Sequence, residues 1–175
     1  MFCESCMFDW SINYYDKVIR ADKDYVTFGY SSFIIMMTAG RLIGDKFIAG
    51  FGALSVLWFN GLLMTAGIIL VISFPSVLLA SIGFSLIGLG SSIVVPIVYS
   101  LAGKSKKMTP GYAIASITMV GYVGFLSSPL IIGALSDRFG MQAAFGILIL
   151  FSLIVSILAI GLKKNWWLAG TNVTR

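Results

Sequence analysis

Two acidic residues, Glu4 and Asp9, lie near the start of the sequence in an otherwise apolar stretch. Ser5, Asp9 and Asn13 recur every four residues and would share one helix face, while Glu4 lies on an adjacent face. An ionised side chain costs about 3 kcal/mol at the centre of a membrane helix, so it normally faces a bundle interior or water. We therefore expect Asp9 and Asn13 to face an aqueous cavity. The alternative is that this segment lies in water and its acids have no role.

Two later segments resemble each other and place charges where apolar stretches end. The first is GRLIGDKF, residues 40–47, and the second is GALSDRFG, residues 133–140, which follows Pro129 by a few positions. The residues of interest are Gly40, Arg41, Gly44, Asp45, Lys46, Pro129, Gly133, Asp137, Arg138 and Gly140. Asp45 could pair with Arg41 or Lys46, or could be a solvated charge. Gly40 and Gly44 have the GxxxG spacing that permits close helix–helix approach in lipid.

The elements that carry these residues are long apolar runs. Of 175 residues, 58% are hydrophobic and 11% are charged, whereas soluble domains carry about 25% charged residues. A helix needs about 20 apolar residues to cross a bilayer, and the runs lack the alternation of barrel strands. The composition thus excludes a soluble enzyme and predicts an all-α membrane protein. The runs cover about 25–44, 53–74, 77–102, 112–135 and 142–162.

These runs predict five full transmembrane helices plus the end of a sixth, residues 1–15, in one transmembrane domain covering 1–175. The chain divides into two three-helix units, about 1–74 and 77–162, followed by a tail, 163–175. Because three crossings is an odd number, the units would insert with opposite topology, as in the inverted repeats of secondary transporters. The two similar segments would then face opposite sides of the membrane.

Lysines and arginines accumulate on the cytoplasmic side of membrane proteins. Alternate crossings put eight basic residues on one side: Arg41, Lys46, Lys104, Lys106, Lys107, Lys163, Lys164 and Arg175. The other side receives four: Lys17, Arg20, Lys23 and Arg138. The C-terminus is therefore predicted to be cytoplasmic, in a bacterial inner membrane. Loop asymmetry also explains the net charge of +5, so no nucleic-acid partner is expected.

GRLIGDKF resembles the loop signature between the second and third helices of each six-helix half in the major facilitator superfamily. SPLIIGALSDRFG, residues 128–140, is similar to the end of that family's eleventh helix and the following turn. The opening ESCMFDWSINYY resembles the end of the seventh helix in sugar-permease-like members, and GYAIASITMVGYVGFLSSP adds to the likeness. Together they cover about residues 4–162, the C-terminal six-helix half.

The resemblance implies a secondary active or facilitative transporter that moves a small solute between two rocking halves. Asp45, Asp137 and Arg138 would then act in gating, while turn capping is the alternative for the latter two. Trp10 would stack on a solute such as a sugar, and Glu4 would carry a coupling proton. Further cavity candidates, each of which could equally serve packing, are Tyr30, Tyr99 and Tyr122.

The expected partners are membrane lipid, a small-molecule solute and either the missing N-terminal six-helix half or a second copy. No cofactor and no metal is expected, and the absence of histidine leaves no conventional catalytic pair for an intramembrane enzyme. The alternative function is a small self-associating or structural membrane protein with no solute of its own.

Overall fold

The computed structural model describes residues 1–104 and 108–168, the last five of these by their backbone alone. Every regular element in those residues is helical, which confirms the predicted all-α class. The elements are α1 (Phe2–Tyr14), the π-helical turn η1 (Tyr15–Ile19), α2 (Phe28–Phe51), α3 (Ala53–Ser73), α4 (Val77–Ser91), α5 (Val94–Gly103), α6 (Pro110–Phe139) and α7 (Met141–Leu168).

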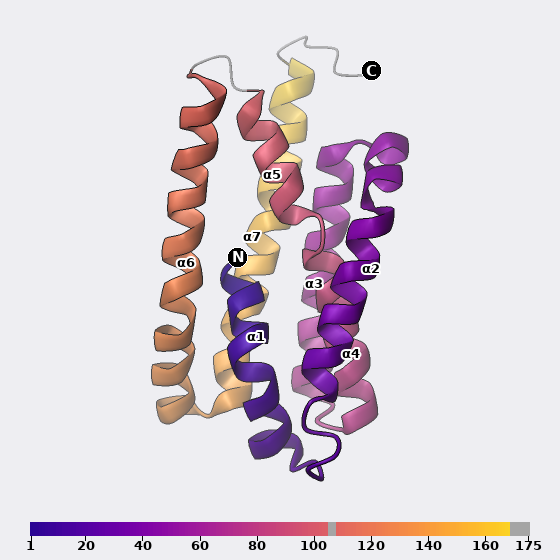
Figure 1. Cartoon of the computed structure of the whole chain (residues 1–175), viewed down its shortest axis with the longest axis vertical. Coiled ribbons are helices and arrows are strands. Elements are labelled where there is room, and N and C mark those ends of the chain that lie inside the picture. The colour runs from indigo at the N-terminus through magenta and orange to yellow at the C-terminus, as the bar shows by residue number, and fades with distance from the viewer. Residues whose placement is uncertain (105–107, 169–175) are drawn as a thin grey trace.

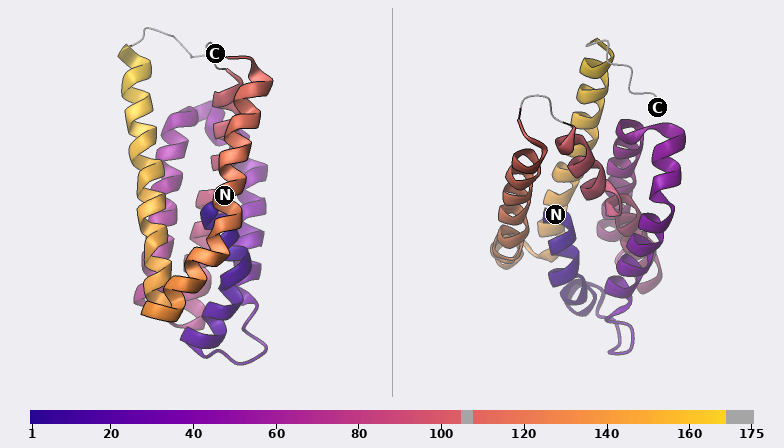
Figure 2. Two further views of the ribbon diagram at one scale, coloured as in Figure 1. Left: turned by 90° about the vertical axis from the view of Figure 1, so that its left-hand side faces the viewer. Right: turned by 45° about the horizontal axis from the view of Figure 1, so that its top comes forward.

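The helices lie roughly along one long axis (Figures 1 and 2). In Figure 1, α2, α4, α5 and α7 run toward the top of the bundle, and α1, α3 and α6 run toward the bottom. The α3 helix packs against both α4 and α7, α2 packs along α4, and α1 packs against α6. The division into two inverted three-helix units, about 1–74 and 77–162, stays a prediction.

Four segments are long and apolar enough to cross a membrane: Ala53–Ser73, Val77–Gly103, Pro110–Phe139 and Met141–Lys163. The five expected crossings correspond to these four and to α2. The α2 helix is also long, at 24 residues, but Arg41, Asp45 and Lys46 make its second half more polar. The α1 helix begins halfway along the bundle (Figure 1).

Glycines bring three of the helices into backbone contact. A Cβ atom added at Gly67 of α3 would lie 2.7 Å from the carbonyl oxygen of Gly83 of α4, and one added at Gly83 would lie 2.8 Å from that of Gly67. Across the α2 interface, a Cβ at Gly40 would lie 2.8 Å from the Cβ of Ser92. The close approach expected of the GxxxG pair thus occurs, with α2 resting on the α4–α5 junction.

The helices differ in detail from the expected apolar runs at three places. The second helix continues past Gly44 to Phe51 and stops at Gly52, whose φ of 80° favours glycine. The expected crossing at 77–102 corresponds to the span Val77–Gly103. Two helices make up this span, because the chain leaves helical geometry at Ile93, three residues before Pro96. Helix α7 extends into the predicted tail as far as Leu168, and residues 169–175 lie outside the described part, as do Lys106 and Lys107.

The two charged segments lie at opposite ends of the bundle, as expected. The first belongs to the upper end of α2 and the second to the lower end of α6 (Figure 1). The α6 helix continues a few residues beyond the predicted run of 112–135 and ends at Phe139, and Gly140 provides the positive φ of 84° that turns the chain into α7.

Candidate functional site

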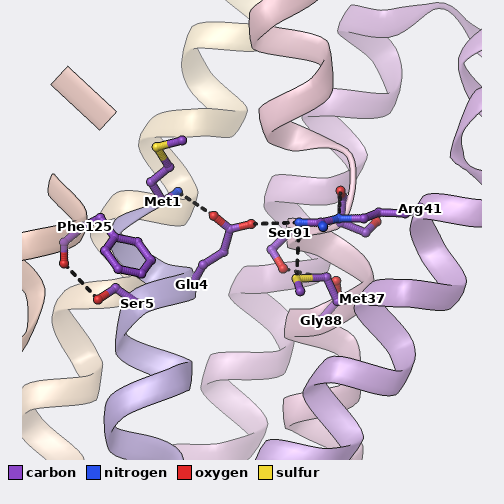
Figure 3. A network of polar contacts seen from close by, with 9 residues as sticks. Met1, Glu4, Ser5, Met37, Arg41, Gly88, Ser91 and Phe125 are labelled. Atoms are coloured by element: carbon purple, nitrogen blue, oxygen red, sulfur yellow. Dashed lines mark hydrogen bonds and ion pairs between the residues drawn. The ribbon is translucent and has the colours of Figure 1, made fainter. Parts of the chain in front are cut away.

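Helix α1 places Glu4 inside the bundle beside Arg41 of α2 (Figure 3). The Glu4 side chain is 10% exposed, and its Oε1 lies 3.9 Å from Nη2 of Arg41. Its Oε2 lies 3.0 Å from the amine of Met1. A buried carboxylate needs such cationic partners because desolvation penalises its charged form.

Of the alternatives expected for Asp45, the structure shows the solvated charge. Within the described residues, Asp45 has no ion pair with Arg41 or Lys46, because the Arg41 guanidinium turns toward α1 and α4 instead. Asp45 and Lys46 are both exposed in the second half of α2.

Arg41 also holds the break between α4 and α5. Its Nε donates a hydrogen bond of 3.3 Å to the backbone carbonyl of Ser92. In an unbroken helix that carbonyl would accept from the residue four positions later, which is Pro96 and has no N–H. Arg41 therefore links the Glu4 carboxylate to a backbone acceptor that proline has left without a helical partner.

The same relationship recurs at Pro129, inside α6. The carbonyl four residues earlier belongs to Phe125, and it accepts a hydrogen bond of 2.8 Å from the Ser5 hydroxyl of α1 (Figure 3). Ser5 is completely buried, whereas Phe125 is half-buried.

A third case lies at the end of α3. Pro75 cannot donate to the carbonyl of Val71, and the buried Tyr14 hydroxyl of α1 donates to it at 2.8 Å. Prolines are tolerated at membrane depth where neighbouring helices satisfy the carbonyls that they free. The fourth proline, Pro110, has its corresponding carbonyl at residue 106, outside the described part.

Asp9 contacts Ser5, the residue that bonds to the Phe125 carbonyl. Its Oδ2 lies 3.1 Å from the Ser5 hydroxyl, and Asn13 donates to its backbone carbonyl at 3.3 Å. The shared face predicted for Ser5, Asp9 and Asn13 therefore exists. A serine hydroxyl has one proton, so Ser5 cannot donate to Asp9 and to the Phe125 carbonyl at once. The side chain of Asp9 is exposed.

Trp10 is half-buried and packs toward α6. A Cβ added at Gly133 would lie 3.4 Å from the Trp10 ring, so glycine makes room for the indole. The Trp10 Nε1 is buried and has no hydrogen-bond partner among the described residues. The structure thus gathers Glu4, Asp9, Trp10 and Asn13 on one helix and brings Gly133 to them.

The three tyrosine candidates are separated. Tyr30 of α2 is closest to α1, with its ring 6.1 Å from that of Phe8. Tyr99 of α5 accepts a hydrogen bond of 3.3 Å from Thr118 of α6, and Tyr122 is 56% exposed on α6.

The charges at the end of α6 do not reach the α1 cluster. Asp137 and Arg138 are exposed beside Gly140, at the opposite end of the bundle from Asp45. Neither forms an ion pair within 4.0 Å among residues 1–104 and 108–163. Pro129 contributes through the Phe125 carbonyl rather than through its own side chain.

The Tyr14 hydroxyl and the Ser92 carbonyl were not expected in this site, and Ser5 was expected only to share a helix face with Asp9 and Asn13. A signal for them is present: a carbonyl four residues before each internal proline needs an outside donor. Sequence alone identifies these acceptors, but the donors lie far away along the chain.

The chain matches known proteins over most of its length. The family model of the Major Facilitator Superfamily matches residues 7–165. An uncharacterized MFS-type transporter of Yersinia pestis is 39% identical over 153 residues, covering 87% of this chain and 40% of that protein. The membrane protein MosC of Rhizobium meliloti is 29% identical over 165 residues, covering 94% of this chain and 40% of MosC.

An uncharacterized transporter of Sinorhizobium fredii is 30% identical over 161 residues, which are 92% of this chain and 43% of that protein. The chain therefore spans about 40% of the length of these curated relatives. No solved structure matches the chain. Its apolar helices, the family match and these transporter relatives lead to one conclusion: the chain is an integral membrane protein of the Major Facilitator Superfamily.

Proposed function

We propose that the chain forms one half of a proton-coupled transporter that moves a small polar solute by alternating access, and that Glu4 and Asp9 are its protonatable groups. One observation carries the proposal. Each acid contacts a side chain that donates to a carbonyl left without a helical donor by a proline. Glu4 contacts Arg41, which donates to the Ser92 carbonyl, and Asp9 contacts Ser5, which donates to the Phe125 carbonyl.

Protonation of Glu4 would remove the negative charge that faces Arg41. An ionised Glu4 attracts the guanidinium, whereas a neutral carboxyl does not. Among the described residues, Arg41 would then keep its contacts to the Ser92 carbonyl and Met37 but lose the attraction of Glu4, and the α1–α2 connection at the α4–α5 break would loosen.

Protonation of Asp9, by contrast, would strengthen the contact between α1 and α6. An ionised Asp9 can only accept, so it competes with the Phe125 carbonyl for the single Ser5 proton. A protonated Asp9 can donate to Ser5, which leaves the Ser5 proton for Phe125. The two acids thus bias two helix contacts that a moving bundle must remake, and such a bias is what coupling requires.

The second half of the transporter would lie against α6. In α6 only 11% of the spanning window is buried, the lowest share among the four spans. Its outward side chains include Met119, Val120, Val123, Leu126 and Leu130, each at least 63% exposed. Asp9 and Tyr122 are also exposed, so a solute between the halves would meet them.

The test is uptake by cells that express the complete reading frame containing this chain, across a panel of sugars and other small polar solutes with and without a proton gradient. Glu4→Gln and Asp9→Asn should each abolish gradient-driven uptake at normal expression, while Asp16→Asn, a change in an exposed residue of η1, should have no effect. Gradient-driven uptake that is unchanged in both acidic variants would refute the proton-carrying role.

Asp45 supplies a separate test of gating. If Asp45 contacts the other half in one state only, Asp45→Asn should slow uptake without preventing membrane insertion. Wild-type uptake in that variant would remove the gating role. The mass of the complex in detergent decides between an N-terminal half and a second copy as the partner, and a monomer with no solute would favour a structural membrane protein.

A further inference from the structure

An apolar pocket of about 830 Å³ lies on the side of the bundle formed by α2, α3 and α7, with the end of α4 and the α4–α5 break at its base. Aromatic side chains form much of its wall: Phe47, Phe51, Trp58 and Phe59. These four are each between 41% and 69% exposed, so the pocket opens outward rather than into the bundle. Its size is within the range of small-molecule sites.

The pocket has the length of one membrane leaflet. Its α2 lining extends from Gly40 to Phe51, which at 1.5 Å per residue is about 16 Å along the helix. The hydrocarbon core of a bilayer is about 30 Å thick, so the pocket is about as long as one leaflet is thick and would hold the ester region and the upper part of an acyl chain.

Two polar features lie along this apolar length. At the outer end, the Lys163 ammonium donates to the Ser55 hydroxyl at 3.0 Å. Deeper by five residues of α3, or about 7.5 Å, lies Asn60. Asn60 is only 6% exposed, and its Nδ2 has no hydrogen-bond partner among the described residues. Asn60 thus leaves one donor at the pocket wall that an acceptor group of a ligand would satisfy.

We propose that this pocket binds an anionic phospholipid, with its phosphate at Lys163 and Ser55, an ester carbonyl at Asn60 and an acyl chain along the aromatic wall. The order of groups matches, because the glycerol esters of a phospholipid lie deeper in the bilayer than its phosphate. The charge matches too: the same end of the bundle carries the exposed lysines Lys46, Lys104 and Lys163 against one acid, Asp45, within the described residues. The acyl chain would rest on Ser92 and Ile93, at the helix break.

The experiment uses the whole chain in phosphatidylcholine vesicles and reads the fluorescence of Trp58. Phosphatidylglycerol with a brominated acyl chain is added at a low fraction, and brominated phosphatidylcholine serves as the matched lipid. A Trp58→Phe variant isolates the Trp58 signal from that of the other tryptophans. Phosphatidylglycerol should quench Trp58 at lower lipid fraction than phosphatidylcholine does.

Two variants test the polar contacts. Lys163→Gln should reduce the preference for phosphatidylglycerol about fivefold, the effect of one lysine near an anionic headgroup, whereas Lys104→Gln should leave it unchanged. The wild-type chain should also prefer ester-linked over ether-linked phosphatidylglycerol, and Asn60→Leu should remove that preference. The buried thiols of Cys3 and Cys6 should remain unreactive in every variant, which shows that it is folded.

Equal quenching by both lipids, or a preference unaffected by Lys163→Gln, would overturn the proposal. Absence of quenching by any lipid together with a dimer mass would show that a second copy covers the pocket, which also overturns it.

Discussion

The contact between Gly67 and Gly83 gives a quantitative prediction about packing. A Cβ at Gly83 would lie 2.6 Å from Cγ2 of Val71 and 2.8 Å from the Gly67 carbonyl oxygen. Favourable carbon contacts lie at about 3.5–4.0 Å, so α3 and α4 would have to separate by roughly an ångström. Such overpacking costs about 1–3 kcal/mol, against a gain of up to about 1 kcal/mol from alanine in a helix. Gly83→Ala should therefore lower the free energy of unfolding by about 1–2 kcal/mol.

Gly67→Ala should cost about the same, because its Cβ meets the reciprocal carbonyl. Both changes require the same separation of α3 and α4. The double variant should therefore cost less than the sum of the two, a coupling that a double-mutant cycle measures. Gly146→Ala of α7 is the matched control, since a Cβ there would meet nothing within 4 Å.

Unfolding in mixed micelles of mild detergent and SDS can be followed through the reactivity of Cys3 and Cys6, both free and buried. The thiols react when α1 leaves the bundle, so the midpoint reports stability. A Gly83→Ala variant as stable as Gly146→Ala, or strictly additive costs in the cycle, would refute the close α3–α4 approach.

Three further predictions concern the carbonyls freed by proline. Tyr14→Phe should lower the free energy of unfolding by about 1 kcal/mol, because the Val71 carbonyl loses its donor; an unchanged SDS midpoint would contradict this. Arg41→Lys should destabilise the chain in the same assay despite keeping the charge, because lysine lacks the Nε donor that reaches Ser92; equal stability would show that charge alone matters. Pro96→Ala restores an N–H for Ser92, so Arg41→Gln should cost less in that background than alone, and equal costs in the two backgrounds would remove the link between the arginine and the proline.

Much of the architecture could be predicted from the sequence. Long apolar runs and scarce charge determined an all-α membrane protein, because hydropathy and helix length are local properties that add along the chain. Glycine and proline marked real features: Gly140 ends α6, and Pro96 follows the break between α4 and α5. The motifs around GRLIGDKF and SDRFG resemble those of the Major Facilitator Superfamily, whose family model matches residues 7–165.

The tertiary structure alone decided which groups meet. The sequence left open whether Asp45 pairs with Arg41 or Lys46 or is a solvated charge, and the structure directs Arg41 to Glu4 and to the Ser92 carbonyl. Likewise, the positions of the prolines predict which carbonyls lack a helical donor, but not which side chains donate to them. Such partners come from helices that are distant in sequence, and glycine contacts set how closely those helices approach. Hydrogen bonds and ion pairs form only when the distance between the helices is correct to within an ångström, and no sequence pattern specifies that distance.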